Sequence, residues 1–179
     1  MKELDIALYK AELLELVNAA IEKLKAEKAG FEVFTLCLCT DFNSCYSAVY
    51  IDSKEHSDRS LSQSRKWEEE QYLKCLEKGN LQQAEFFKEQ LDSYENVIRE
   101  TNPADFELCD FVSMENKSFA MNYEEENCEE CWELATPILE EVAQFAYLEV
   151  RKSLNVHPQF EVAVNGEDDW YYPITPIEK

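Results

Sequence analysis

Two cysteine pairs have the spacing that sulfur chemistry uses. Cys128 and Cys131 form a C-x-x-C motif, and Cys37 and Cys39 form a C-x-C motif. A dithiol oxidoreductase places its reactive thiol at a helix start, close to cations that stabilise the thiolate. Here glutamates surround Cys128. Because like charges disfavour formation of the thiolate, a redox role is not favoured.

The same four cysteines are weak candidates for a four-thiolate zinc site, because zinc accepts four cysteine ligands. However, Cys37 and Cys39 occupy alternate positions of an expected strand, whereas cysteine ligands of zinc usually flank a tight turn. Buried cysteine is also common as a small apolar side chain. We therefore expect no metal and no cofactor, with zinc binding as an alternative.

Other reactive side chains form no recognisable motif. His56 and His157 lie in the segments KEHSD and NVHPQ, and the chain has no GxSxG, Walker-type or HExxH sequence. Carboxylates are so numerous that choosing any two as a hydrolytic pair is uninformative. No catalytic residue is predicted, and an uncharacterised enzyme that uses cysteines or carboxylates is an alternative.

The net charge is the strongest functional signal. The 179 residues include 38 acidic and 17 basic side chains, a net charge of -21, while the hydrophobic content of 45% is that of a globular protein. Such a field repels phosphates and anionic lipids, so we expect no direct contact with nucleic acid or membrane. It attracts a basic protein partner. Solvation alone is the alternative explanation.

The acidic residues are concentrated late in the chain. Between Thr101 and Val150 there are thirteen acidic residues and one basic residue, Lys117. Repulsion at this density costs stability, which indicates a use. Trp132 and Trp170 are expected nearby as aromatic interface anchors, although Trp132 fits a core position better. The candidate partner-binding residues are Glu124, Glu125, Glu126, Glu129, Glu130, Trp132 and Glu133.

The first half of the chain contains the elements that must position these residues. Residues 4–28 have the periodicity of a helix, which Gly30 ends. The segments FEVFTLCLCT and CYSAVYID predict a β-hairpin, and the two apolar faces of its first strand predict a central position. From Ser60 to Glu100 the sequence is charged and helical. Gly79-Asn80 indicates the turn of a helical hairpin, with one continuous helix as the alternative.

The second half contains a possible strand at residues 107–113 and then a long amphipathic helix at 134–154. Thr136-Pro137 fits a helix start, whereas a start at Cys128 would place Pro137 inside the helix as a kink. The segment PQFEVAV predicts a strand, and Asn165-Gly166 indicates a hairpin into EDDWYYPI.

These elements predict one α+β domain, residues 1–179, with a central helical insertion at about 60–100. An antiparallel-rich sheet of about four strands would pack against the long C-terminal helix, the N-terminal helix and the central helical hairpin. The odd number of seven cysteines and the charged N-terminal segment predict a reduced, cytoplasmic protein. The sequence leaves the oligomeric state open.

The arrangement resembles a bacterial family, domain of unknown function 4303. The resemblance rests on the N-terminal helix running into FEVFTLCLCTD, on SAVYID, on NPADFEL, and on LEEVAQFAYLEV leading to FEVAVNGEDDW. It implies a small cytosolic α+β protein without an established activity, similar in setting to immunity proteins that neutralise bacterial toxins. It supplies no catalytic pattern, so no residue role is transferred.

We therefore expect a non-enzymatic binding module, of the immunity type, whose acidic face blocks a basic toxin such as a nuclease. Besides the enzyme or zinc protein, the other alternative is a housekeeping or scaffold domain whose acidity serves only solvation.

Overall fold

The computed structural model describes residues 4–119 and 128–177. The chain has the predicted α+β composition and divides into two compact units. The first unit comprises the residues up to Lys54 and those from Thr101 onward, and the second comprises Glu55–Glu100. Within the described residues, no helix is both long enough and apolar enough to cross a membrane.

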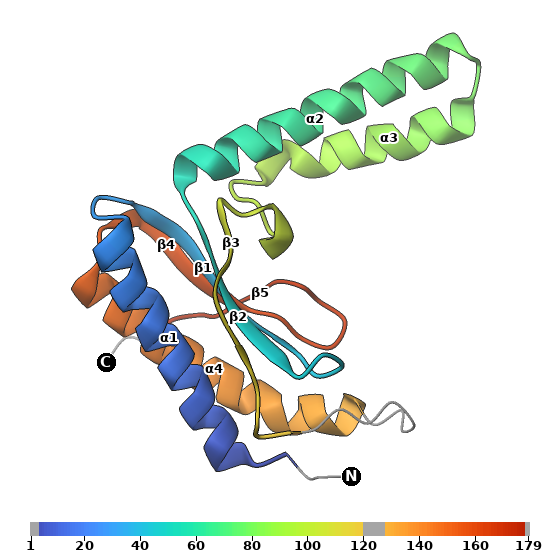
Figure 1. Ribbon diagram of the computed structural model, residues 1–179. Coiled ribbons are helices and arrows are strands. Elements are labelled where there is room, and N and C mark those ends of the chain that lie inside the picture. Colours follow the sequence, from blue (N-terminus) through green and yellow to red (C-terminus); the bar gives the residue numbers. More distant parts are fainter. Residues whose placement is uncertain (1–3, 120–127, 178–179) are drawn as a thin grey trace. The chain divides into compact units, whose positions relative to one another are not determined.

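The first unit is built on a five-stranded sheet with the order β3-β2-β1-β4-β5 (Figure 1). The predicted hairpin consists of β1 (Val33–Asp41) and β2 (Tyr46–Asp52), and β3 (Leu108–Glu115) pairs antiparallel with β2. On the other side, β4 (Val156–Val164) runs parallel to β1, and the short β5 (Tyr172–Pro173) pairs antiparallel with β4. The central position predicted for β1 is confirmed.

Two helices cover one face of this sheet (Figure 1). They are α1 (Ile6–Glu27), which Asp5 caps by accepting a hydrogen bond from the Leu8 amide at 3.0 Å, and α4 (Cys128–Ser153). A strand that joins a sheet in parallel needs a long connection from the strand before it in the chain. For β4 that preceding strand is β3, and α4 supplies the connection. The apolar stripes of both helices pack on the sheet in a helix-side core, whose members include Leu13, Val17, Leu24, Leu36, Leu38, Val49, Ile51, Leu139, Val142, Ala146 and Val162.

The opposite face of the sheet carries a smaller second-face cluster of Cys37, Cys39, Ala163 and Phe106, with Tyr50 and Tyr171 packed against it. Phe106 directly follows a short 3-10 helix, Pro103–Asp105. Both faces of β1 are therefore covered, as its composition predicts.

The start of α4 resolves the two alternatives for Pro137. The helix begins at Cys128, so Pro137 lies inside it and the start at Thr136-Pro137 is wrong. The Thr136 hydroxyl does not cap a helix start but donates to the Trp132 carbonyl oxygen, one turn earlier, at 2.8 Å. Because Pro137 is exposed, water can replace the backbone hydrogen bond that proline cannot donate.

The second unit is a helical hairpin of α2 (Lys54–Glu77) and α3 (Leu81–Ser93), followed by a 3-10 turn at Tyr94–Asn96. Gly79 has a φ of +69°, which favours glycine, and the Asn80 side chain caps α3. The turn at Gly79-Asn80 is thus confirmed, and the continuous helix is wrong. The first helix begins at Lys54, earlier than the expected Ser60.

A buried carboxylate ties α1 to the segment that follows β3. Glu12 is only 6% exposed. It accepts hydrogen bonds from the Asn116 side chain at 3.1 Å, the Lys117 amide at 2.7 Å and the Ser118 hydroxyl at 2.6 Å. Burial alone would raise the pKa of Glu12, but these hydrogen bonds outweigh it and hold the pKa below its ordinary value.

The hydrogen bonds continue from Asn116 across the sheet. Its side-chain oxygen accepts from Ser47 at 2.8 Å, Ser47 bonds Thr40 at 2.8 Å, and Thr40 bonds the Tyr9 hydroxyl at 2.8 Å. Every link is buried. A polar chain therefore joins α1, β1, β2 and the segment after β3 within the first unit.

Glu12→Gln, which keeps the shape and removes the charge, should lower the free energy of unfolding at neutral pH by on the order of 2 kcal/mol, because charged hydrogen bonds to buried donors are lost. The folded-state pKa of Glu12 lies below its ordinary value of 4.5. Its contribution is therefore present above that value and is lost as the pH falls through the folded-state pKa.

Denaturant unfolding at neutral pH and in acid tests this expectation, with the exposed Glu15→Gln on the same helix as the control. The stability gap between wild type and Glu12→Gln should shrink in acid. An equal gap at both pH values would contradict the assigned role.

Candidate functional site

An open depression of about 260 Å³ lies where β1 and β4 end. Because these strands are parallel, their carboxyl ends meet at the same edge of the sheet. The β1–β2 turn, α4 and the β4–β5 loop all contribute to its wall. We call it the acidic–aromatic depression, and its lining includes Asp41, Glu167, Asp168, Asp169, Phe42, Trp132 and Trp170.

The loop that carries most of these acids is anchored by Asn165. This buried side chain accepts from the Thr40 amide at 2.9 Å and donates to the Thr40 carbonyl oxygen at 2.9 Å. It thereby extends the pairing of β1 with β4 beyond the last residue of β4. The Gly166 amide then donates to the Asp169 carbonyl oxygen at 2.7 Å and closes the loop. These hydrogen bonds fix the first residues of the β4–β5 loop.

The two tryptophans of the depression differ in burial. Trp132 is partly buried, with its ring edge-on to Phe42 at a centroid distance of 4.8 Å, and it packs against the helix-side core. This agrees with the core position that the sequence favours, yet the same ring lines the depression. Trp170 is 75% exposed. The depression thus has one fixed aromatic wall and one exposed ring.

The predicted partner-binding glutamates lie at the start of α4. Glu130 and Glu133 are exposed there, and the helix backbone places Glu129 in the first turn. Glu124, Glu125 and Glu126 lie outside the described residues. Trp132, on the same part of α4, connects this helix start to the depression.

Sequence reasoning misses the four carboxylates of the depression as a group. Asp41 is the last residue of β1, whereas Glu167, Asp168 and Asp169 follow β4. They meet only because β4 adds parallel to β1, and a parallel pairing leaves no local turn signal. The one available signal is that Asp41 ends one apolar segment and that the other three acids follow another apolar segment within five residues.

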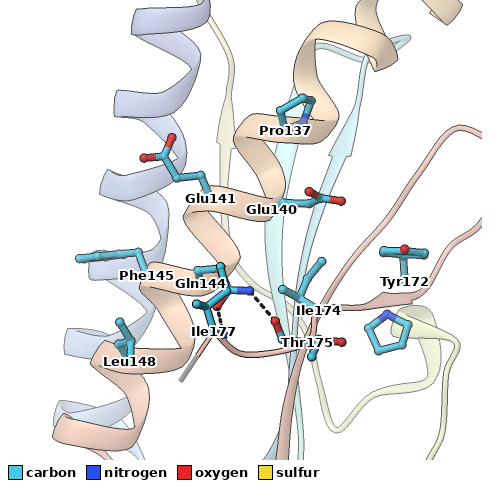
Figure 2. Close-up of a pocket in the computed structure, with 11 residues that line it drawn as sticks. Pro137, Glu140, Glu141, Gln144, Phe145, Leu148, Tyr172, Ile174, Thr175 and Ile177 are labelled. Atoms are coloured by element: carbon cyan, nitrogen blue, oxygen red, sulfur yellow. Dashed lines mark hydrogen bonds between the residues drawn. The ribbon is translucent and has the colours of Figure 1, made fainter. Parts of the chain in front are cut away.

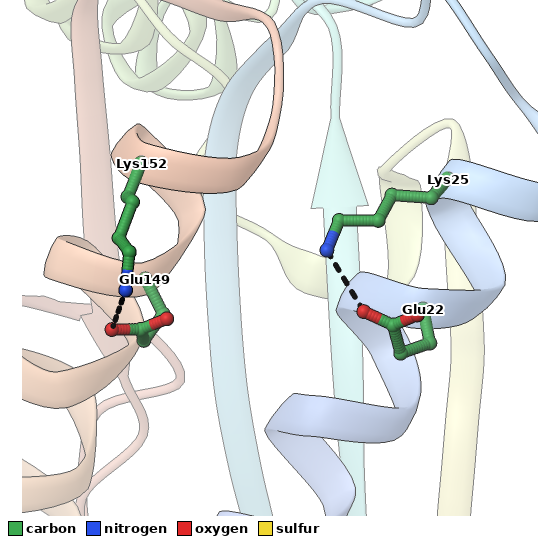
Figure 3. A network of polar contacts seen from close by, with 4 residues as sticks. All are labelled: Glu22, Lys25, Glu149 and Lys152. Carbon is green, nitrogen blue, oxygen red and sulfur yellow. Dashed lines mark hydrogen bonds and ion pairs between the residues drawn. The ribbon is translucent and has the colours of Figure 1, made fainter.

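Ion pairs between neighbouring residues of one helix neutralise few of the acidic side chains. Glu22–Lys25 at 2.8 Å and Glu149–Lys152 at 3.4 Å each join residues of one helix (Figure 3). Exposed pairs of this kind contribute about 0–1 kcal/mol each. Within the described part of the chain, the carboxylates of the depression form no ion pair.

The cysteine motifs do not converge. Cys37 and Cys39 are buried in the second-face cluster with sulfur atoms 3.5 Å apart, whereas Cys131 packs against the helix-side core. Burial, and then the neighbouring Cys39, raises the pKa of Cys37 and so disfavours its thiolate. Cys128 is the first residue of α4. Among the described residues, no three metal-ligating side chains group together.

A second hollow, of about 720 Å³, runs between α4 and the C-terminal segment (Figure 2). Gln144 holds that segment, since its side chain donates to the Thr175 carbonyl oxygen at 2.7 Å and accepts from the Ile177 amide at 3.1 Å. The lining is mostly apolar. Its charged members are Glu140 and Glu141, and Glu141 is paired with Lys10 at 2.6 Å. This groove offers contact area but no reactive group.

Asn165→Ala should lower the free energy of unfolding by about 2–3 kcal/mol, because it leaves the buried amide and carbonyl of Thr40 without their partner. Hydrogen exchange of the amides of residues 166–170 should accelerate as well. Asn43→Ala, at an exposed position of the same depression, is the control and should stay within about 0.5 kcal/mol. Unchanged exchange in the loop would show that Asn165 does not fix it.

Comparisons with known proteins add no assignment to this site. No protein-family model, no curated protein and no solved structure matches the chain. The resemblance to the domain of unknown function 4303 family stays a prediction.

Proposed function

We propose that this chain is a non-enzymatic binding module that holds a basic protein at the acidic–aromatic depression and the adjoining start of α4. One observation carries the proposal. Four carboxylates that form no ion pair with any described residue line a depression together with a partly buried tryptophan and an exposed one, and three of these carboxylates lie on the loop that Asn165 anchors.

The chemistry of the depression suits lysine or arginine side chains. Carboxylates attract either cation, and an indole face adds a cation–π interaction of about 0.5–2 kcal/mol. Trp170 is exposed in the depression, and tryptophan is one of the residue types enriched at binding hot spots. The net charge of -21 adds long-range attraction, which accelerates encounter with a basic partner.

The biological form of this proposal is an immunity-type protein that neutralises a basic bacterial toxin in the cytoplasm. Its support is the charge, the acidic–aromatic depression and the resemblance of the sequence segments. Fast association suits such an inhibitor, because it must bind the toxin before the toxin reaches its target. The partner would cover the depression by using its own cationic surface.

The first experiment is capture from a lysate of the source organism on the immobilised protein, at low and then raised salt. A basic protein should be retained at low salt and released at high salt, since screening weakens attraction between exposed charges. Retention that does not respond to salt would contradict an electrostatic interface.

Charge reversal then locates the interface. Asp168→Lys with Asp169→Lys should slow association with the captured protein at least about tenfold at low salt and flatten its salt dependence. The matched control is Glu27→Lys with Glu32→Lys, which changes the net charge equally at exposed positions just before β1 begins. Equal slowing in both variants would assign the effect to net charge alone and favour the solvation alternative.

Trp170→Ala separates the aromatic contribution from the charge. We expect the dissociation rate to rise about tenfold or more, with little change in the association rate, because the ring makes short-range contacts. Surface plasmon resonance with the captured protein measures both rates. An unchanged dissociation rate would remove Trp170 from the interface.

A further inference from the structure

The side of α4 that is turned away from the sheet carries a row of residues at helical spacing, which we call the outer row. Its members are Leu134, Pro137, Glu141, Gln144 and Leu148, which follow one another at intervals of three and four residues. The exposed fraction of Leu134 is 45% and that of Leu148 is 56%, and Pro137 is exposed as well. A continuous exposed apolar surface of this kind marks an interaction site.

The C-terminal segment turns the second half of the outer row into a groove. Gln144 holds this segment through the Thr175 carbonyl oxygen and the Ile177 amide, at 2.7 and 3.1 Å (Figure 2). Ile177, which is 70% exposed, and Tyr172, which is 53% exposed, therefore line the hollow of about 720 Å³ opposite α4. This volume lies within the range of about 300–1,000 Å³ that is typical of binding pockets.

The charges beside the outer row are acidic. Before its last turn, α4 has six acidic residues and no basic residue. Glu130, Glu133 and Glu140 are exposed and form no ion pair with any described residue, whereas Glu141 is paired with Lys10. Apolar side chains next to unpaired carboxylates favour a partner that presents apolar and cationic side chains together.

The charge also decides between the possible occupants of the groove. A second copy of this chain would bring its own net charge of -21, and it would be repelled. The phosphates of nucleic acid and of anionic lipids would be repelled as well. A basic protein segment is attracted.

The length and straightness of the outer row favour a helical segment. From Glu130 to Leu148 the helix rises about 27 Å, which equals the length of a partner helix of about 18 residues. A helix packs beside another helix by placing side chains of i, i+3, i+4 and i+7 spacing into its grooves. An extended segment would bring only every second side chain to the groove.

We propose that the outer row and its groove bind a basic amphipathic helix of the partner. The apolar side chains of that helix enter the groove, and its lysine or arginine side chains lie beside Glu130, Glu133 and Glu140. This inference rests on the proposed binding function, because Glu130 and Glu133 belong to the start of α4 that adjoins the acidic–aromatic depression.

A synthetic helix tests the proposal. The probe is a fluorescein-labelled peptide of about 18 residues, made of leucine and lysine, with its leucines at i, i+3, i+4 and i+7 spacing. A second peptide has the same composition in an order that removes this spacing. Fluorescence anisotropy with the whole chain at low salt should give the amphipathic peptide a dissociation constant at least about tenfold lower than that of the second peptide. Equal affinities would overturn the proposal.

Substitutions in the groove locate the binding site of the peptide. Leu148→Ser with Ile177→Ser should raise the dissociation constant of the amphipathic peptide at least about tenfold, since a few apolar anchors contribute most of the affinity of an interface. Leu73→Ser with Leu76→Ser, at exposed apolar positions of α2, is the matched control and should change it less than about twofold. An unchanged dissociation constant in the groove variant would overturn the proposal.

Charge reversal tests the cationic contacts. Glu133→Lys with Glu140→Lys should raise the dissociation constant of the amphipathic peptide at least about tenfold at low salt. Glu27→Lys with Glu32→Lys, which changes the net charge equally, should raise it less than about threefold. Equal weakening in both variants would contradict the placement of the cations beside α4.

The protein captured from the lysate separates this inference from the proposed function. Its affinity should fall in the variant with Leu148→Ser and Ile177→Ser, as well as in the variant with Asp168→Lys and Asp169→Lys. Loss of affinity in the second variant alone would overturn the helix-binding groove and leave the proposed function standing.

Discussion

The buried Glu12 carboxylate is the constraint on which the first unit depends. A charge in a protein interior is tolerated only where donors surround it, and here the donors come from residues 116–118. Those donors fix the chain after β3 against α1, and the Asn116 amide also donates to the Cys45 carbonyl oxygen at 2.8 Å. The polar chain then passes through Ser47 to Thr40. A misregistered strand would leave several of these groups unpaired, so the network selects one packing.

The same network supports the acidic–aromatic depression. Thr40 is at once a link of the polar chain and the residue whose backbone Asn165 binds. Phe42, two residues on, packs between Phe119 and Trp132. Repulsion among converging carboxylates would open a loop that had no anchor. Here an apolar and hydrogen-bonded base holds the loop, so acidic groups can line one depression despite their mutual repulsion.

The periodicity of apolar residues, together with the turn residues, is sufficient to predict the helices and strands. The two apolar faces of FEVFTLCLCT predict the central strand, and Gly79-Asn80 predicts the helical turn. The pairing of strands that lie far apart in the sequence cannot be predicted in this way. A crossover helix leaves no local trace of which strand it returns to, so it could not be predicted that Asp41 and Asp168 line one depression. Pro137 shows a second limit, because an exposed proline inside a helix and a proline at a helix start have the same local sequence.

The place of β4 in the sheet also bears on how the protein is made. β1 lies between β2 and β4, yet β4 follows it by more than half of the chain. During synthesis α1 and the first three strands can assemble while one edge of β1 has no partner, until the residues of β4 leave the ribosome. That edge is apolar on both faces, which invites pairing with another chain. Nascent chains, and products truncated before Val156, are therefore the species that chaperones must protect.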